Sequence, residues 1–126
     1  MKYLVTGGAG FIGSHLTKKL VEEGNDITII DNLNTGKEKN LESIKNKIDF
    51  VKGSILDIEL LEKLTKDVDG VYHQAALASV QDSFSKPDEY HDVNVNGTEN
   101  ILKLAKQYNF KVVYASSSSV YGNPVR

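Results

Sequence analysis

Glycines stand at positions 7, 8, 10 and 13, between a short apolar run at 2–6 and a stretch whose apolar residues have helical spacing. We predict that Gly7 allows a sharp turn off a strand, that Gly10 leaves room for a phosphate group, and that Gly13 lets a helix lie close to a sheet. The N–H groups and positive dipole end of that helix would face the phosphates. The pattern indicates a phosphate-binding turn, although a ligand-free strand–helix turn has the same spacing.

An acidic residue follows at the end of the next apolar run. Residues 26–30 have the composition of a buried strand, and Asp31 stands at its carboxyl end. An acid about 20 residues beyond such glycines binds the ribose hydroxyls of an adenine dinucleotide. Asp31 alone would also suit a strand-end turn, but together with the glycines it predicts dinucleotide binding.

The composition is that of one ordinary globular domain. The chain has 126 residues, of which 40% are hydrophobic and 25% charged, with a net charge of −2. This charge gives no reason to expect nucleic acid or an acidic membrane as a partner. The absence of cysteine excludes disulfides, a thiolate nucleophile and Cys-based metal sites, and we expect no metal. There is no signal-peptide pattern and no apolar run near the roughly 20 residues of a membrane span, so we expect a cytoplasmic protein.

Strand and helix patterns alternate along the chain, which predicts an α/β fold with a parallel sheet covered on both faces. The predicted strands are 2–6, 26–30, 48–51, 71–73 and 111–115, and the predicted helices are 12–23, 37–45, 58–66 and 88–108. Right-handed crossovers then give a Rossmann doubly wound sheet with strand order 3-2-1-4-5. The glycine turn, Asp31, Ser54, the small pair 75–76 and the serine run 116–119 all follow strands. They should therefore meet in one crevice at the point where strand order reverses.

Five segments carry a family resemblance, and they occur in order at sensible spacing. They are TGGAGFIG at 6–13, DNL at 31–33, HQAA at 73–76, NVNGT at 94–98 and SSSSVYG at 116–122. Together they resemble the extended short-chain dehydrogenase/reductases of the NAD-dependent epimerase/dehydratase type, most closely the UDP-glucose (UDP-hexose) 4-epimerases. The resemblance covers essentially the whole chain.

The resemblance implies NAD across the crevice. The implied cofactor-binding residues are Gly7, Gly10, Phe11, Ile12, Gly13, Asp31, Asn32, Asn34, Thr35, Gly36, Ser54, Ile55, Ala75, Ala76, Leu77 and Asn94. Phe11 and Ile12 would meet the pyrophosphate through their backbone, and Asp31 with Asn32 would meet the adenosine ribose. Residues 54–55 would flank the adenine, where Ser54 replaces the family's usual aspartate. Residues 75–77 would line the nicotinamide half.

Catalytic residues are implied in the serine run. Ser117, four residues before Tyr121, matches the family's active-site serine and would bond the sugar hydroxyl that is oxidised; Ser119 would touch substrate. Asn94 would sit in a helix behind the active site. His73 has no carboxylate or histidine partner at ligand spacing, so we interpret it as a packing residue.

The family's base, a tyrosine with a lysine four residues later, has no match here. None of the six tyrosines is followed by lysine at that spacing, Tyr121 included. By resemblance the Tyr-x-x-x-Lys element and the substrate domain lie beyond Arg126. We therefore expect 1–126 to be an incomplete NAD-binding domain, truncated after the fifth strand and inactive alone.

The resemblance predicts a parent enzyme that epimerises a UDP-hexose through a transient 4-keto sugar. A sugar-nucleotide 4,6-dehydratase is disfavoured, because Ser118 and Ser119 stand where that chemistry uses an Asp-Glu pair. The non-enzymatic alternative is a catalytically inert NAD-binding module. The sequence does not select among UDP-glucose, its N-acetyl form and UDP-glucuronate. The family also implies a homodimer through helix 88–108.

Overall fold

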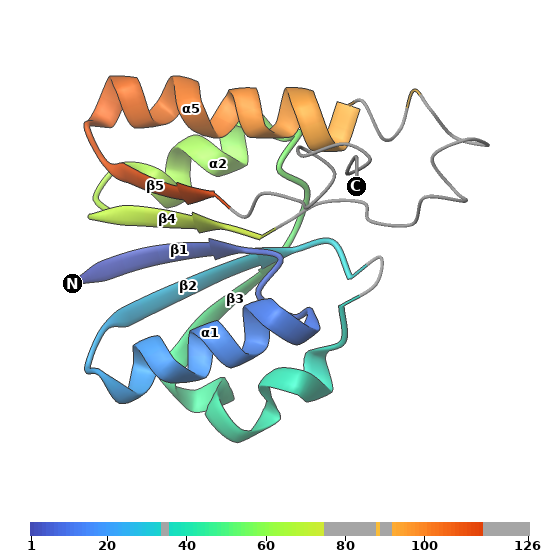
Figure 1. Cartoon of the computed structure of the whole chain (residues 1–126), viewed down its shortest axis with the longest axis vertical. Coiled ribbons are helices and arrows are strands. Elements are labelled where there is room, and N and C mark those ends of the chain that lie inside the picture. Colours follow the sequence, from blue (N-terminus) through green and yellow to red (C-terminus); the bar gives the residue numbers. More distant parts are fainter. Residues whose placement is uncertain (34–35, 75–87, 89–91, 115–126) are drawn as a thin grey trace, which may run out of the picture.

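The computed structural model describes residues 1–33, 36–74, 88 and 92–114. A five-stranded parallel sheet with order β3-β2-β1-β4-β5 forms their centre (Figure 1). Its strands are β1 (Lys2–Thr6), β2 (Asp26–Asp31), β3 (Ile48–Lys52), β4 (Gly70–His73) and β5 (Lys111–Tyr114). The predicted α/β fold and strand order are confirmed.

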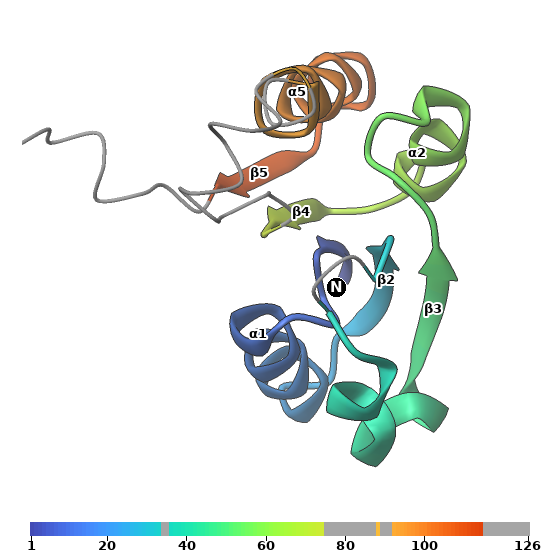
Figure 2. The same cartoon turned by 90° about the vertical axis from the view of Figure 1, so that its right-hand side faces the viewer.

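Helices cover both faces of the sheet. They are α1 (Phe11–Glu22), η1 (Glu38–Lys47), α2 (Ile58–Thr65), η2 (Asp92–Asn96) and α5 (Gly97–Tyr108). Figure 2 shows α1 and η1 on one side, with α2 and α5 on the other, as the crossover rule requires. None of the helices in the described part of the chain has the length and apolar character needed to cross a membrane.

Two of these helices differ from the predicted ones. The segment predicted as a helix at 37–45 is a 3₁₀-helix, η1, in which Leu41 and Ile44 are the buried residues. A 3₁₀-helix stacks residues three apart on one line, so this winding buries both of them together. Within the helix predicted at 88–108, residues Asp92–Asn96 form a π-helical turn, η2, and α5 begins after it at Gly97.

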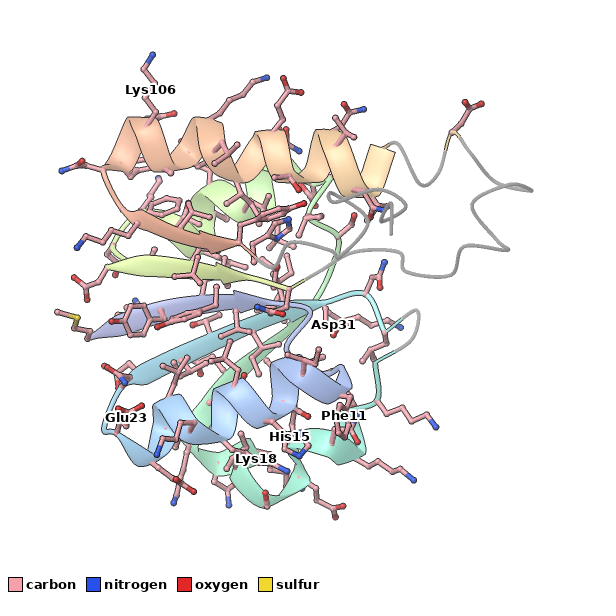
Figure 3. All side chains as sticks on the ribbon, viewed as in Figure 1. Phe11, His15, Lys18, Glu23, Asp31 and Lys106 are labelled. Atoms are coloured by element: carbon pink, nitrogen blue, oxygen red, sulfur yellow. The ribbon has the colours of Figure 1, made fainter. Side chains whose placement is uncertain are left out.

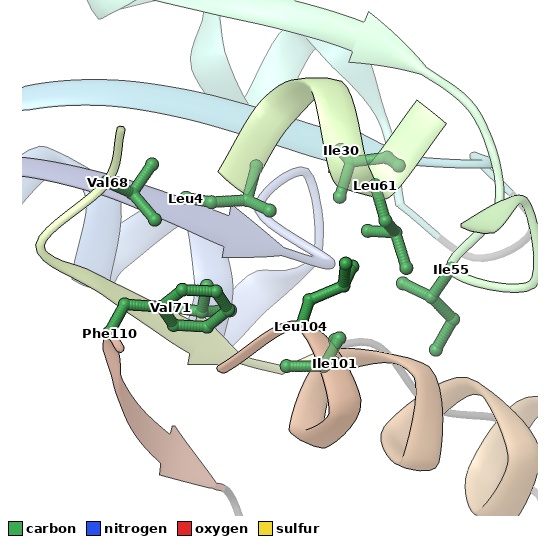
Figure 4. Packing of buried hydrophobic residues seen from close by; sticks show 9 residues of the cluster. All are labelled: Leu4, Ile30, Ile55, Leu61, Val68, Val71, Ile101, Leu104 and Phe110. Atoms are coloured by element: carbon green, nitrogen blue, oxygen red, sulfur yellow. The ribbon is translucent and has the colours of Figure 1, made fainter. Parts of the chain in front are cut away.

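The core consists of two clusters, one on each face of the sheet. Figure 4 shows the cluster under α2 and α5, which consists of Leu4, Ile30, Ile55, Leu61, Val68, Val71, Ile101, Leu104 and Phe110. The cluster under α1 and η1 consists of Val5, Ala9, Leu20, Ile27, Ile29, Leu41 and Ile44. Leu4 and Val5 are neighbours on β1 yet belong to opposite clusters, because successive strand side chains point to opposite faces.

The register of the sheet aligns the carboxyl ends of its central strands. Thr6 of β1 pairs with Ile30 of β2 on one side and with His73 of β4 on the other. The loops that leave these strands therefore begin at the same edge. This is the point where strand order reverses, and open α/β sheets bind ligands there.

Candidate functional site

The glycine turn begins with a residue in the left-handed region. Gly7 has φ of 69°, and its N–H donates to the Ile30 carbonyl of β2 over 2.9 Å. The Gly7 carbonyl in turn accepts from the N–H of Gly10 over 3.1 Å. Gly7 thus provides the sharp turn expected of it, since only glycine adopts positive φ without steric cost.

The next glycines pack the turn against the fold. A Cβ on Gly13 would overlap the Gly7 carbonyl oxygen and lie 2.9 Å from the Gly8 Cα. Gly13 therefore lets α1 lie directly against the turn that leaves β1. Gly8, for which we predicted no role of its own, packs against the sheet. Its added Cβ would lie 2.7 Å from the Ile29 side chain of β2.

Gly10 is different, because little surrounds it. Within the described part of the chain, a Cβ there would meet only the Gly7 oxygen, at 3.4 Å. Gly10 is also the N-cap of α1 and makes no side-chain capping bond. The first N–H groups of a helix have no partner within it, and those of Phe11 and Ile12 belong to exposed residues. The start of α1 therefore has both the space and the donors that an anion requires.

The Asp31 carboxylate is held by backbone donors from two loops. Its Oδ2 accepts from the Ala9 N–H over 3.0 Å, and its Oδ1 accepts from the Leu33 N–H over 2.8 Å. The residue is only 8% exposed. A carboxylate has about four acceptor positions, so each oxygen could accept one hydrogen bond beyond the one that the described residues provide. Figure 3 shows Asp31 and Phe11 at the same end of the sheet.

The chain after β2 folds back over the glycine turn. A Cβ on Gly36 would lie 2.8 Å from Asp31 Oδ2 and 3.0 Å from Ala9. The Ala9 carbonyl accepts from the Lys37 N–H over 3.0 Å and from Asn40 Nδ2 over 2.8 Å. Ala9 thus joins the turn to Asp31 through its N–H and to residues 37–40 through its carbonyl. Asn40 lies in a polar stretch with no distinguishing pattern, so the sequence offered no signal for it.

Ser54 and Ile55, the two residues predicted to flank the adenine, differ in their burial and contacts. Ser54 is half-buried, and its Oγ accepts from the Leu56 N–H over 3.1 Å. Ile55 is buried in the cluster of Figure 4, where an added Cβ on Gly97 would overlap it. The Ile55 carbonyl accepts from Asn100 Nδ2 over 3.1 Å. The Ile55 side chain is therefore a core contact between the chain after β3 and α5.

His73 lies at the carboxyl end of β4, as buried as the predicted packing role requires, and both ring nitrogens are hydrogen-bonded. Nδ1 lies 2.7 Å from Thr6 Oγ1, and Nε2 lies 2.8 Å from Thr98 Oγ1. The Thr98 hydroxyl also donates to the Asn94 carbonyl in η2. Burial lowers the pKa of His73 from 6.5 to about 4, so the ring is neutral at neutral pH. Sequence reasoning missed these partners, because they are far apart in the chain.

The described residues thus bring together the glycine turn, Asp31, the exposed Asn32, Gly36 and the η2 turn with Asn94, all around one edge of the sheet. The remaining predicted site residues lie outside the described ranges. They are Asn34, Thr35, Ala75, Ala76, Leu77, Ser117 and Ser119.

Comparison with known proteins finds one matching family model and relatives with two different activities. The model of the "NAD dependent epimerase/dehydratase family" matches residues 3–126. The chain is 49% identical to a Methanocaldococcus jannaschii protein named "Putative UDP-glucose 4-epimerase", over 96% of this chain and 40% of that protein. It is 44% identical to the UDP-N-acetyl-alpha-D-glucosaminuronate decarboxylase of Bacillus cytotoxicus, over 94% of this chain and 37% of that protein.

A solved structure shows the same relationship. The UDP-glucose 4-epimerase of Stenotrophomonas maltophila, with bound NAD and formylated UDP-arabinopyranose, matches with a TM-score of 0.91 and 34% identity. The match covers 100% of this chain and 40% of the epimerase. The chain therefore spans about two fifths of the length of the relatives it matches.

Proposed function

This chain belongs to the NAD dependent epimerase/dehydratase family, and on that premise we propose that the protein it comes from is an NAD-dependent 4-epimerase of a UDP-hexose. The reaction would invert C4 of the sugar through a transient 4-keto sugar. NAD, when bound, supplies the hydride acceptor and returns the hydride to the sugar. The relatives that are named 4-epimerases support this choice.

The observation that carries the NAD-dependent part of the proposal is the geometry of Asp31. Its carboxylate is fixed by Ala9 of the glycine turn and by Leu33, and among the described residues each oxygen accepts one hydrogen bond of the two that it can accept. Two adjacent acceptors of this kind match the two hydroxyls of an adenosine ribose. Gly10 leaves open space beside the first turn of α1 for the pyrophosphate. The residues present therefore fit the cofactor that the family uses.

For the chemical step we propose Ser117 as the residue that bonds the C4 hydroxyl, with Ser119 as a further substrate contact. The base that takes the hydroxyl proton would be a tyrosine with a lysine four residues later. No tyrosine of residues 1–126 has this partner. We therefore place the base in the part of the relatives' length that this chain does not span.

A sugar-nucleotide decarboxylase is the second candidate, because the Bacillus relative with that name is 44% identical. Oxidation at C4 of a UDP-uronate would place a ketone β to the carboxylate, and such a keto acid loses CO₂ readily. The two candidates therefore share their first step. They differ in whether the sugar has a carboxylate and in what is released.

The test uses the full-length protein with UDP-glucose, its N-acetyl form and UDP-glucuronate in parallel. The proposal expects interconversion of a UDP-hexose with its C4 epimer and no net consumption of NAD. Ser117→Ala should lower kcat by about 10²-fold or more while the NAD dissociation constant changes little. Ser43→Ala, on an exposed serine of η1, is the matched control. Release of CO₂ from UDP-glucuronate without epimerisation would favour the decarboxylase, and NAD binding without turnover of any UDP-sugar would favour the inert module.

We also propose that the full-length protein is a homodimer through the outward face of α5. Leu102 is 52% exposed there, among the exposed Glu99, Lys103 and Lys106. A helix–helix contact on this face would remove the Leu102 side chain from water. Light scattering at micromolar concentration should give a dimer, and Leu102→Glu should give a monomer. A monomeric parent protein would contradict this proposal.

A further inference from the structure

A continuous chain of hydrogen bonds crosses the carboxyl edge of the sheet and ends in the π turn η2. The Gln74 N–H donates to Thr6 Oγ1 over 3.0 Å, and Thr6 Oγ1 lies 2.7 Å from His73 Nδ1. On the other side of the ring, His73 Nε2 lies 2.8 Å from Thr98 Oγ1, which donates to the Asn94 carbonyl over 2.9 Å. These links connect the ends of β1 and β4 with the turn before α5.

The direction of every link follows from the groups at its two ends. A carbonyl only accepts, so the single Thr98 hydroxyl proton points to Asn94, and His73 Nε2 must therefore be the donor to Thr98. A neutral imidazole has one N–H, so Nδ1 accepts from the Thr6 hydroxyl. Thr6 in turn accepts from the Gln74 N–H, which only donates. The structure is thus consistent with one tautomer of His73, protonated on Nε2.

The surroundings of His73 leave it little freedom. The residue is 2% exposed, and Thr6 beneath it is fully buried. The ring of Tyr114 on β5 stacks on it, with ring centroids 5.7 Å apart and an interplanar angle of 27°. Buried polar groups are costly unless all of them are bonded, and a fully bonded network is rigid. An apolar side chain of the same size would fill the space but would leave the Thr6 and Thr98 hydroxyls without this link.

We propose that His73, as the neutral Nε2–H tautomer, is a positioning residue that fixes the turn Asp92–Asn96, and Asn94 with it, against the carboxyl ends of β1 and β4. This inference rests on the proposed function, because that edge is where the NAD crevice is placed. π-turns are frequent at functional sites and leave irregular backbone that needs external partners. Gly97 gives a second fixed point on the same helix start, since its backbone lies directly against Ile55.

The test is a double-mutant cycle in the full-length protein. In His73→Asn the amide reaches only the Nδ1 position, so the variant can keep the bond to Thr6 but lacks a donor for Thr98. Thr98→Val removes the acceptor of the same His73–Thr98 bond, together with the bond from Thr98 to the Asn94 carbonyl. Each variant should weaken NAD binding by about tenfold or more, because each loses at least one buried hydrogen bond. Both substitutions break the bond between His73 and Thr98. The double variant should therefore bind NAD no more weakly than the single variant with the lower NAD affinity. Thr98→Ser keeps the hydroxyl and should restore binding to within about twofold.

Thr65→Val is the matched control. Thr65 is a fully buried helix threonine whose hydroxyl donates to the carbonyl four residues back, as that of Thr98 does, but it has no histidine partner among its hydrogen bonds in the described structure. Its loss should lower stability, leave NAD affinity unchanged and add independently to the effect of His73→Asn.

A readout that needs no activity is the ¹⁵N shift pattern of the His73 ring, which distinguishes the two tautomers directly. An Nδ1–H tautomer, additive effects of His73→Asn and Thr98→Val, or unchanged NAD affinity in both would overturn the inference. Tight NAD binding without epimerisation would instead contradict the proposed 4-epimerase activity. In that case the double-mutant cycle, measured as NAD affinity, would still decide the role of His73.

Discussion

The Asp31 carboxylate accepts a hydrogen bond from the Ala9 N–H over 3.0 Å, which joins the end of β2 to the turn that leaves β1. Asp31, the residue predicted to bind the ribose, therefore also holds the glycine turn in place. A dinucleotide that contacts both Asp31 and the glycine turn would contact two segments joined by a hydrogen bond. Substitution of Asp31 should for this reason affect the two halves of the cofactor together.

The first prediction is that the full-length protein binds NAD more tightly than NADP. The 2′-phosphate of NADP would approach the Asp31 carboxylate, and like charges at such distances cost on the order of 1–4 kcal/mol at partly screened sites. The preference for NAD should therefore be about tenfold or more. Titration of the protein with both cofactors measures it directly, and equal or tighter binding of NADP would refute the ribose role of Asp31.

Asp31→Asn extends this test. Its amide group places an N–H₂ near one of the two backbone donors, so one support of the glycine turn is lost along with the charge. NAD should bind more weakly and the discrimination against NADP should shrink. Asp26→Asn is the matched control, since Asp26 is an exposed carboxylate at the opposite end of the same strand.

The second prediction separates two glycines of the turn. Gly10 has φ of −75° and ψ of 176°, which alanine adopts freely, and a Cβ there would have open space. Gly10→Ala should change the free energy of unfolding by less than about 1 kcal/mol but weaken NAD binding about tenfold or more, because the methyl group occupies the phosphate space. Gly13→Ala should destabilise the fold by about 1–3 kcal/mol, because its Cβ overlaps the Gly7 carbonyl.

Denaturant unfolding and NAD titration of both variants check this contrast. Gly24→Ala is the control: Gly24 has φ of 88°, but no described residue lies within 4 Å of its added Cβ. It should cost about 1 kcal/mol from backbone strain and leave NAD binding unchanged. If Gly10→Ala proved as destabilising as Gly13→Ala and did not change NAD affinity, the space at Gly10 would have no role in binding.

Most of the fold was predictable from local patterns. The alternation of apolar runs and helical spacing gives the elements, and the handedness of crossovers gives the order β3-β2-β1-β4-β5. Gly24 follows the end of α1 with a positive φ, the conformation in which glycine commonly ends a helix. The windings of η1 and η2 were not predictable, because short polar segments with few apolar residues carry no clear period.

The site was predictable only where a spacing carries chemistry. Glycine spacing and a strand-end acid predict where Gly7 and Asp31 lie, because each has a backbone or charge requirement of its own. The bonds of His73 to Thr6 and Thr98 join residues on three elements, and no periodicity relates such positions. Likewise, nothing in the sequence distinguishes Asn40 from its polar neighbours.

The third prediction concerns acid stability. Burial lowers the pKa of His73 from 6.5 to about 4, so between these values the unfolded chain binds more protons than the folded one. The His73 contribution to the free energy of unfolding should be complete above pH 6.5. It should be lost as the pH drops towards 4, by at most about 3 kcal/mol. His73→Gln should remove this dependence of the free energy of unfolding on pH. His15→Gln, on an exposed histidine, should keep it. Denaturant unfolding between pH 4 and 8 tests the difference, and equal slopes for all three proteins would exclude His73 as its source.

The last prediction concerns residues 1–126 expressed alone. We expect this segment to show no useful epimerisation of UDP-hexoses, since none of its six tyrosines has a lysine four residues later and a positioned base contributes about 10²–10⁴-fold. Val113 and Tyr114, which are 51% and 56% exposed on the edge strand β5, should also make it prone to association. A coupled epimerase assay on the segment and on the full-length protein, with light scattering of both, measures the two effects. Robust turnover by the segment would show that a group within it serves as the base, and it would contradict our placement of the catalytic tyrosine beyond Arg126.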